Sequence, residues 1–302
     1  MTSGAQGLSS RIVENVFLYI AAIAVSLLLL ITFLMVYFVI RYHWKRNPQP
    51  ADISGSTWLE IVWTLVPTFL VLTMFYYGYT GFQSLKKVPE GAIKIKVIAR
   101  QWSWLFEYEN GLKSPELRVP VGKSINLSLT SQDVIHSFYM PAFRIKQDAV
   151  PGMISHLWFK PTEVGTYDVL CAEYCGLQHS YMLTKVVVLP EGEFNQWYQT
   201  WKEIEAKVPP GAQLFQEKGC KACHSIDGTP GVGPTLKGLY GKTVTALTGG
   251  KERTVVAGDA YIRKSILEPS ADVVKGFPPI MPTQKLTDQE MEEILQYLKE
   301  LK

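Results

Sequence analysis

Residues 171–182 gather four side chains of the kinds that bind soft metal ions. They supply the thiols of Cys171 and Cys175, the imidazole of His179 and the thioether of Met182. Thiolate, thioether and imidazole ligands favour copper or zinc over magnesium or calcium. Successive offsets of four, four and three residues suit a tight loop wrapped around one centre. The pattern predicts a metal site, with copper as the preferred metal.

Two other interpretations of this loop compete with copper. The first is a structural zinc site, but zinc rarely recruits methionine. The second is a disulfide between Cys171 and Cys175. A disulfide that closes so short a loop would be strained.

A second motif, Cys220-Lys-Ala-Cys223-His224, follows the attachment pattern of c-type haem. Two thioether bonds hold the porphyrin in such a site, and the adjacent imidazole is the proximal iron ligand. Met281 and Met291 are the candidates for the distal ligand. Met291 falls on the apolar face of an expected helix and reads as a core residue. Met281 is the favoured ligand, because nearby prolines would fix its sulfur in a loop.

Composition supports these two sites and excludes a role with nucleic acid. The chain has 302 residues and a net charge of only +3, so no basic surface of the kind that binds nucleic acid is indicated. All four cysteines lie in the two motifs, which leaves none for a disulfide framework. His43 and His156 lie outside both motifs and are interpreted as solvated or structural.

The N-terminal part predicts a transmembrane hairpin. Residues 16–40 form a run of 25 residues without a charge, which exceeds the roughly 20 residues needed to cross a bilayer. A second apolar segment covers residues 61–80 and contains Pro67, which membrane helices tolerate. The loop between them is basic, so it should face the cytoplasm. Glu60 stands at the cytoplasmic start of the second span, either simply solvated or part of a path for protons or ions.

From residue 92 the sequence changes to strand-like alternation, separated by turn signals. Several short strands at this spacing predict an antiparallel β-sandwich of about 100 residues. His136 is expected in the loop that follows a strand at residues 124–130. The expected strands cover residues 93–99, 102–108, 124–130, 156–160, 167–171 and 183–189.

The C-terminal part predicts helices around the haem motif. Short helices are expected at residues 211–219 and 259–267. The last helix should begin at a capping box formed by Thr287 and Glu290, with apolar residues at helical spacing after it.

Taken together, the motifs resemble subunit II of haem–copper cytochrome c oxidases, fused to a cytochrome c domain. Segments that follow the family pattern are Leu59–Pro67, Gln101–Tyr108, Asp133–Ser137, Phe143–Gly152 and Cys171–Met182. The resemblance implies a transmembrane hairpin at 1–85, a cupredoxin-like copper domain at 86–190, a linker at 191–208 and an all-α class I cytochrome c domain at 209–302.

The resemblance also implies roles for individual residues. Cys171 and Cys175 would bridge two copper ions in a CuA centre. His136 and Met182 would complete one ion, and His179 with the Glu173 carbonyl the other. The Glu173 carboxylate would bind a magnesium ion shared with subunit I, the surface residue Trp102 would receive electrons, and Glu60 would lie at the mouth of a proton path. Cys220 and Cys223 would attach the haem, with His224 and Met281 as axial ligands of its iron. His224 would also donate a hydrogen bond to the Pro234 carbonyl.

The implied function is to accept electrons for a terminal oxidase. Electrons would pass from cytochrome c or another donor to haem c, to CuA and then to subunit I, where oxygen is reduced with proton pumping. Subunit III is a further expected partner. The expected location is the bacterial inner membrane, with the copper and haem domains on the periplasmic face.

Two other functions compete with this one. The CuA subunit of a nitric oxide reductase would differ in the partner that receives the electrons. A membrane-tethered copper-delivery protein would need exchangeable copper, and it would have little use for a covalent haem.

Overall fold

The computed structural model describes residues 7–49, 52, 54–229 and 231–301. Residues 1–6, 50–51, 53, 230 and 302, which belong to the expected hairpin and haem domains, lie outside the described residues. The chain forms two compact units, Met1–Glu90 and Gly91–Lys302.

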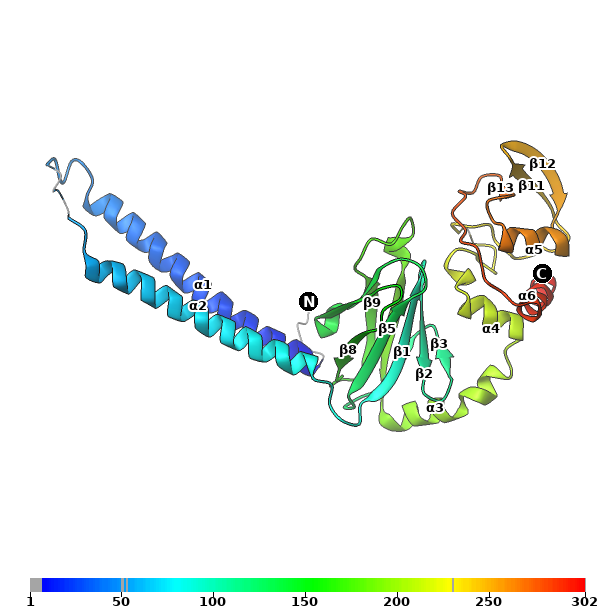
Figure 1. The fold of residues 1–302 in the computed structure, drawn as a ribbon, viewed down its shortest axis with the longest axis horizontal. Helices are drawn as coiled ribbons and strands as arrows, with labels where there is room; N and C mark the ends of the chain where they lie inside the picture. The colour runs from blue at the N-terminus through cyan, green and yellow to red at the C-terminus, as the bar shows by residue number, and fades with distance from the viewer. Residues whose placement is uncertain (1–6, 50–51, 53, 230, 302) are drawn as a thin grey trace. The chain divides into compact units, whose positions relative to one another are not determined.

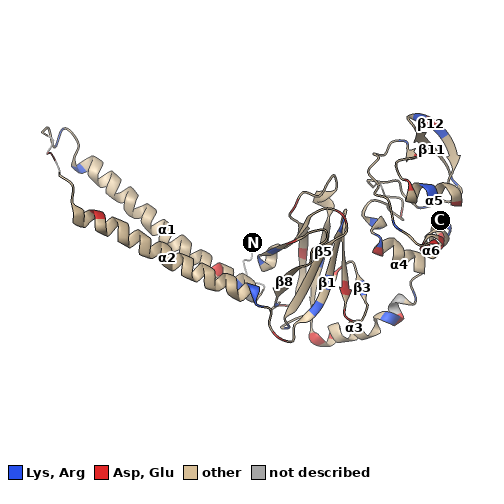
Figure 2. Ribbon diagram, in the orientation of Figure 1, with Lys and Arg blue, Asp and Glu red and all other residues tan. Residues whose placement is uncertain are grey.

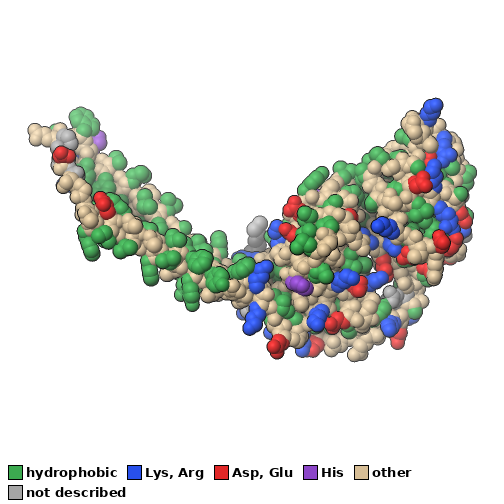
Figure 3. Space-filling view, in the orientation of Figure 1, with side chains coloured by type: hydrophobic (Ala, Val, Ile, Leu, Met, Phe, Trp, Pro, Cys, Tyr) green, Lys and Arg blue, Asp and Glu red, His purple; other side chains and the backbone are tan. Residues whose placement is uncertain are grey.

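The first unit is a hairpin of two long helices, α1 (Leu8–Arg41) and α2 (Thr57–Lys86), as the sequence predicts. Both are long and apolar enough to span a membrane. Figure 2 shows that their charged residues lie near the helix ends, and Figure 3 shows apolar side chains covering the hairpin. Tyr19 donates a hydrogen bond of 2.8 Å to Thr73 and joins the two helices. Since large apolar side chains face outward along both helices, lipid is the surrounding that this unit fits.

The second unit begins with a β-sandwich of two five-stranded sheets, ordered β3-β2-β1-β5-β8 and β4-β10-β9-β6-β7. Most neighbouring strands are antiparallel, but β1 pairs with β5 and β4 pairs with β10 in parallel. The strands are β1 (Ile93–Arg100), β2 (Ser103–Tyr108), β3 (Lys113–Ser114), β4 (Leu117–Pro120), β5 (Ile125–Ser131), β6 (His136–Met140), β7 (Ile145–Ala149), β8 (Ser155–Phe159), β9 (Gly165–Cys171) and β10 (Leu183–Leu189).

Apolar residues from both sheets fill the space between them. In β5, alternate residues from Ile125 to Ser131 are buried, which is the strand period that the sequence shows. Phe106 and Phe138 meet edge to face with ring centroids 6.0 Å apart, and both are fully buried. Helix α3 (Glu191–Glu205) lies in the expected linker (Figure 1). Its residues Phe194 and Trp201 join the same core. The packed core gives the loops at its end a rigid base.

The haem motif lies in a small helical domain at the C-terminal end. It contains α4 (Pro210–Glu217), the short η3 helix (Cys220–Ala222), α5 (Asp259–Leu267) and α6 (Asp288–Glu300). The capping box at the start of α6 is confirmed, with Thr287 and Glu290 each accepting a backbone hydrogen bond from the other. The domain also carries a three-stranded sheet that the all-α expectation did not include: β11 (Thr243–Thr248), β12 (Lys251–Val256) and β13 (Val273–Val274).

A buried carboxylate ties this small sheet to α5. Asp272 accepts hydrogen bonds from Lys264 at 2.7 Å and Arg253 at 2.8 Å, and also from Thr248. The hydrogen bond from Lys264 is the largest cause that lowers the pKa of Asp272, to about 2. The unfolded chain lacks these contacts, so the ionised carboxylate stabilises the folded state.

Asp272→Asn is therefore expected to lower the free energy of unfolding at neutral pH by about 1 to 2 kcal/mol, because its cationic partners still reach water. A depressed carboxylate pKa contributes stability above the unfolded value near 4, and this contribution is lost as the pH falls toward 2. The difference between variant and wild type should shrink over that range in denaturant unfolding of the detergent-solubilised chain. Glu252→Gln, which removes an exposed partner of Lys275, should have a much smaller effect. An equal loss in both variants would contradict the assignment.

Candidate metal centres

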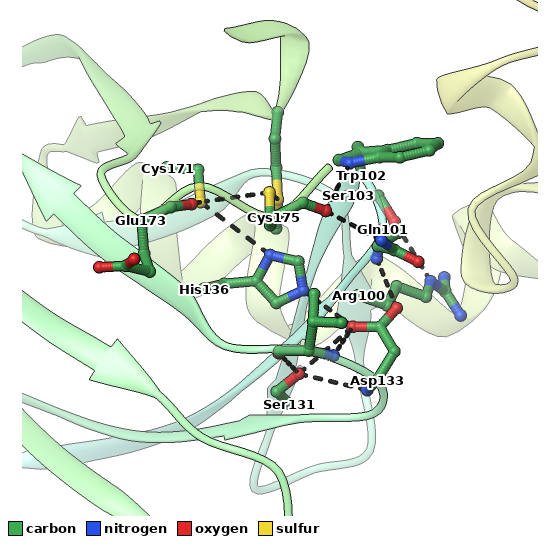
Figure 4. A network of polar contacts seen from close by, with 12 residues as sticks. Arg100, Gln101, Trp102, Ser103, Ser131, Asp133, His136, Cys171, Glu173 and Cys175 are labelled. Atoms are coloured by element: carbon green, nitrogen blue, oxygen red, sulfur yellow. Dashed lines mark hydrogen bonds and ion pairs between the residues drawn. The ribbon is translucent and has the colours of Figure 1, made fainter. Parts of the chain in front are cut away.

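The two thiols of the 171–182 loop lie beside the imidazole of His136 (Figure 4), and the ligand atoms of these three residues all lie within 4.8 Å of one another. Cys171 is the last residue of β9, and Met182 directly precedes β10. His179 begins a short 3-10 helix between these strands. His136 comes from β6, which pairs with β9 beside Cys171. Pairing of β6 with β9 thus brings a ligand from outside the loop to the two thiols.

Close contacts link all of these side chains. The sulfurs of Cys171 and Cys175 lie 3.7 Å apart, and both residues are free thiols rather than a disulfide. Each sulfur has an imidazole beside it: His136 Nδ1 is 4.0 Å from Cys171 Sγ, and His179 Nδ1 is 3.6 Å from Cys175 Sγ. Met182 Sδ is 3.8 Å from Cys175 Sγ. His136 therefore lies beside the Cys171 sulfur, whereas His179 and Met182 lie beside the Cys175 sulfur.

The two thiols differ in their electrostatic surroundings. Burial alone would raise the pKa of Cys171, but the hydrogen bond with His136 and backbone contacts outweigh it and lower the pKa to about 6. Burial and the neighbouring Cys171 raise the pKa of Cys175 to about 12. One thiolate therefore forms readily, and a second negative charge beside it needs a positive charge such as a metal ion.

Asp133 orients the imidazole of His136. Its carboxylate accepts a hydrogen bond of 2.8 Å from His136 Nε2, which leaves Nδ1 facing the sulfurs (Figure 4). Asp133 also accepts backbone hydrogen bonds of 2.7 Å from Gln101 and Val134. Partners of this kind fix the tautomer and direction of a metal-binding histidine. Sequence reasoning gave Asp133 no role, although its position three residues before His136 was a usable signal.

Glu173 and Trp102 have clear positions relative to the sulfurs. The Glu173 carbonyl lies 3.2 Å from Cys171 Sγ, whereas its exposed carboxylate points away from the cluster (Figure 4). Trp102 was expected at the surface, but it is only 6% exposed. Its indole packs against Gly176, and its Nε1 donates a hydrogen bond of 3.1 Å to the Cys175 carbonyl. The expectation that Trp102 lies at the surface was wrong, because the turn that joins β1 to β2 and carries Trp102 folds onto the 171–182 loop.

A cavity in the haem domain brings together the residues of the second motif. Cys220, Cys223, His224 and Met281 all line it, so the structure places both expected axial ligands at one cavity. Met291 instead lies in the buried core of the domain. Most of the other lining residues are apolar, as the surface of a porphyrin requires.

The lining of the cavity fits a haem in three further respects. His224 Nδ1 donates a hydrogen bond of 2.8 Å to the Pro234 carbonyl, the contact that the family resemblance implies, and this leaves Nε2 free for iron. A Cβ at Gly233 would lie 2.7 Å from the His224 ring, so only glycine allows this approach. The buried hydroxyls of Tyr261 and Ser265 have no hydrogen-bond partner among the described residues. These donors fit the propionate groups of a haem.

Glu60 lies apart from both centres, in the first turn of α2. Its side chain is exposed in the structure, and the Ser56 side chain caps the helix by accepting a hydrogen bond from the Leu59 N–H. A carboxylate at this end of a helix is favoured by the helix dipole. The position is consistent with either a solvated residue or one that contacts a neighbouring chain.

Comparisons with known proteins match all three parts of the chain. A sequence model of the cytochrome c oxidase subunit II transmembrane domain matches residues 4–80, and one of its periplasmic domain matches residues 112–189. A cytochrome c model matches residues 208–302.

Individual relatives align with this chain over different lengths. Cytochrome c oxidase subunit 2 of Alkalihalophilus pseudofirmus is 31% identical, over 94% of this chain and 86% of the relative. The subunit of Cereibacter sphaeroides is 30% identical, over 60% of this chain and 73% of its own. The crystal structure of the periplasmic domain of subunit II of cytochrome oxidase from Bradyrhizobium japonicum is 32% identical, with a TM-score of 0.37, over 39% of this chain and 98% of its own.

The fold and the two ligand clusters define a membrane-anchored redox protein with a copper-type sandwich and a haem-type domain. The chain belongs to the cytochrome c oxidase subunit II family and carries a C-terminal cytochrome c domain. It is therefore a subunit of an oxidoreductase complex.

Proposed function

We propose that this chain accepts electrons at a covalent haem c and passes them, through a dinuclear CuA centre, to the oxygen-reducing subunit I of a haem–copper oxidase. The observation that carries the proposal is that one chain holds both ligand sets. Four further candidate copper donors lie around the two cysteine sulfurs, and a haem motif with two axial candidates lines a separate cavity.

The donor count favours two copper ions over one metal. A tetrahedral site uses four ligands, whereas the cluster offers six donor atoms. Cys171 and Cys175 would bridge both ions, since their sulfurs lie at the centre of the cluster. His136 and Met182 would complete one ion, and His179 with the Glu173 carbonyl would complete the other. The thioether and thiolates select copper among the metals that imidazole also binds.

The protein's contribution is to hold these donors still. When bound, copper and haem supply one-electron chemistry, and rigid ligands lower the rearrangement that accompanies a change in charge. The paired strands β6 and β9 hold His136 and Cys171, and Asp133 fixes the His136 ring. In the haem domain, Cys220 and Cys223 would form the thioether bonds, with His224 and Met281 as axial ligands. The Pro234 carbonyl orients His224.

Further roles follow from the proposed partners. The outward carboxylate of Glu173 suits a magnesium ion shared with subunit I, because oxygen ligands suit this cation. Glu60 would stand at the mouth of a proton path that continues in subunit I, and Trp102 would receive electrons for CuA. Subunit III, proton pumping and a bacterial inner-membrane location, with both soluble domains in the periplasm, complete the proposal.

Metal content and spectra of the purified complex test it directly. The expected result is two copper ions and one c-type haem for each copy of this chain, with a mixed-valence dinuclear copper signal in electron paramagnetic resonance. A single copper that a mild chelator removes would instead indicate copper delivery. Turnover with oxygen rather than nitric oxide would separate the oxidase from a nitric oxide reductase.

A further inference from the structure

The turn that joins β1 to β2 contacts the 171–182 loop, which carries the candidate copper ligands, through two side chains. Gln101 Nε2 and Trp102 Nε1 both donate hydrogen bonds to the Cys175 carbonyl, at 2.9 and 3.1 Å (Figure 4). Cys175 is a candidate ligand, so this turn is connected directly to the copper site. The residues that flank the pair, Arg100 and Ser103, contact a different part of the chain.

Arg100 and Ser103 lie against the segment that carries the haem motif. Arg100 Nη2 donates a hydrogen bond of 3.4 Å to the Gln216 carbonyl in the last turn of α4. A Cβ at Gly219 would lie 2.7 Å from Ser103 Oγ and 2.9 Å from Arg100 Nε. Gly219 directly precedes the haem-attachment residue Cys220. A cation at the C-terminal end of a helix is electrostatically favourable, so Arg100 fits the position it occupies.

Two further contacts join the sandwich to the haem domain, and both lie within the compact unit 91–302. Lys113 Nζ forms an ion pair of 2.7 Å with Glu217, the last residue of α4. Cys223 and Ile280 of the haem domain pack against the buried apolar cluster of the sandwich that includes Trp102. Cys223 and Ile280 also line the haem cavity. Haem-domain residues therefore pack against the cluster that contains Trp102.

We propose that the Arg100–Ser103 turn is the docking site for the chain's own haem-attachment segment, residues 216–223, and that Arg100 is the positioning residue that holds it there. The proposal rests on the proposed function and adds a defined route to it. One electron leaves the ferrous haem, which becomes ferric, and enters the copper pair through the Trp102 turn. No bond forms or breaks, and no proton is transferred.

The arrangement also determines where an outside donor can act. Trp102 is 6% exposed, so a separate cytochrome or other reductant has little access to it. An external one-electron donor would reduce the haem, and the haem would reduce the copper pair. Electron transfer rates fall steeply with distance, which is why a fixed contact matters for this step.

The purified complex with both centres loaded provides the test, by photoreduction of the haem and by hydrogen–deuterium exchange of segments 100–104 and 216–223. Arg100→Gln is expected to slow haem-to-copper transfer by about tenfold, because a hydrogen bond from a charged group changes a docking equilibrium by roughly that factor. Exchange in both segments should rise, while the midpoint potentials of both centres stay unchanged. Lys96→Gln removes the same charge from β1, where Lys96 pairs with Glu107 on the exposed surface of the sandwich, and should change neither readout.

Charge reversal provides an independent variant. Lys113→Glu and Glu217→Lys should each slow the transfer, and the double reversal should restore it. If Arg100→Gln and both single charge reversals kept the wild-type rate of electron transfer and the wild-type hydrogen–deuterium exchange, the proposed docking site would be wrong. The proposed function would remain intact. Absence of copper or haem, or of any transfer between them in the wild type, would overturn the proposed function instead.

Discussion

Cys175→Ser is expected to abolish the dinuclear copper signal while leaving the haem attached. Cys175 Sγ lies within 3.8 Å of Cys171 Sγ, His179 Nδ1 and Met182 Sδ, so it contacts three other candidate donors. A serine hydroxyl is a hard ligand and does not replace a bridging thiolate. Copper should fall from two ions to one or none per haem. Electron paramagnetic resonance, with metal analysis of the same sample, measures both quantities.

Cys223→Ser is the matched control, because it makes the same cysteine-to-serine substitution in the haem motif. This variant should keep the dinuclear copper signal and lose one of the two thioether bonds to haem, which mass spectrometry of the denatured chain detects. A dinuclear signal that survives in Cys175→Ser would show that the two sulfurs do not bridge a metal pair. Loss of both centres in either variant would indicate unfolding rather than ligand removal.

Helices were the part of the fold that the sequence predicted best, because their signals are local. The helix expected at residues 259–267 has those bounds in α5, and the capping box marks the start of α6. The apolar runs locate α1 and α2, although both helices extend several residues beyond them. Those extensions mix charged or polar residues with apolar ones, and sequence hydropathy gives no signal for a helix that continues beyond the lipid.

Strands that lack alternation were missed. The sequence placed His136 in a loop, but it begins β6, in which four of the five residues are buried. A strand that is buried on both faces does not alternate between apolar and polar residues. The alternation used to recognise strands in the sequence is therefore missing from β6. The sheet of β11, β12 and β13 was missed for another reason, since the haem motif led to an all-α expectation.

The candidate ligands within the two motifs were predictable from their types and spacing, and His136 from the family resemblance, whereas most of their supporting contacts were not. Cysteine, histidine and methionine at short offsets point to soft metals without any knowledge of the fold. The approach of Gly219 to Arg100 joins residues through tertiary structure, whereas the hydrogen bond that Asp133 accepts from His136 spans only three residues and was overlooked. The burial of Trp102 depends on the same long-range packing, and for this reason its expected exposure was wrong.

Met281→Ala is expected to leave the haem covalently attached but to change its axial ligation and lower its potential. Cys220 and Cys223 hold the porphyrin independently of the sixth ligand, so attachment should survive. A methionine sulfur raises the haem potential, and its loss should lower the midpoint by on the order of 0.1 V, part of the roughly 0.8 V range that axial ligands span. Redox titration and the optical spectrum of the purified chain measure the change.

Met291→Ala separates ligation from packing. Met291 is 3% exposed in the haem-domain core, so its truncation should cost about 2 to 5 kcal/mol of stability and leave the haem spectrum as in the wild type. The two variants are therefore expected to differ: Met281→Ala should change the haem spectrum, and Met291→Ala should change the stability of the domain. An unchanged haem spectrum in Met281→Ala would remove this residue as the ligand. A changed spectrum in Met291→Ala alone would assign the ligand to α6, which would have to turn its buried face toward the iron.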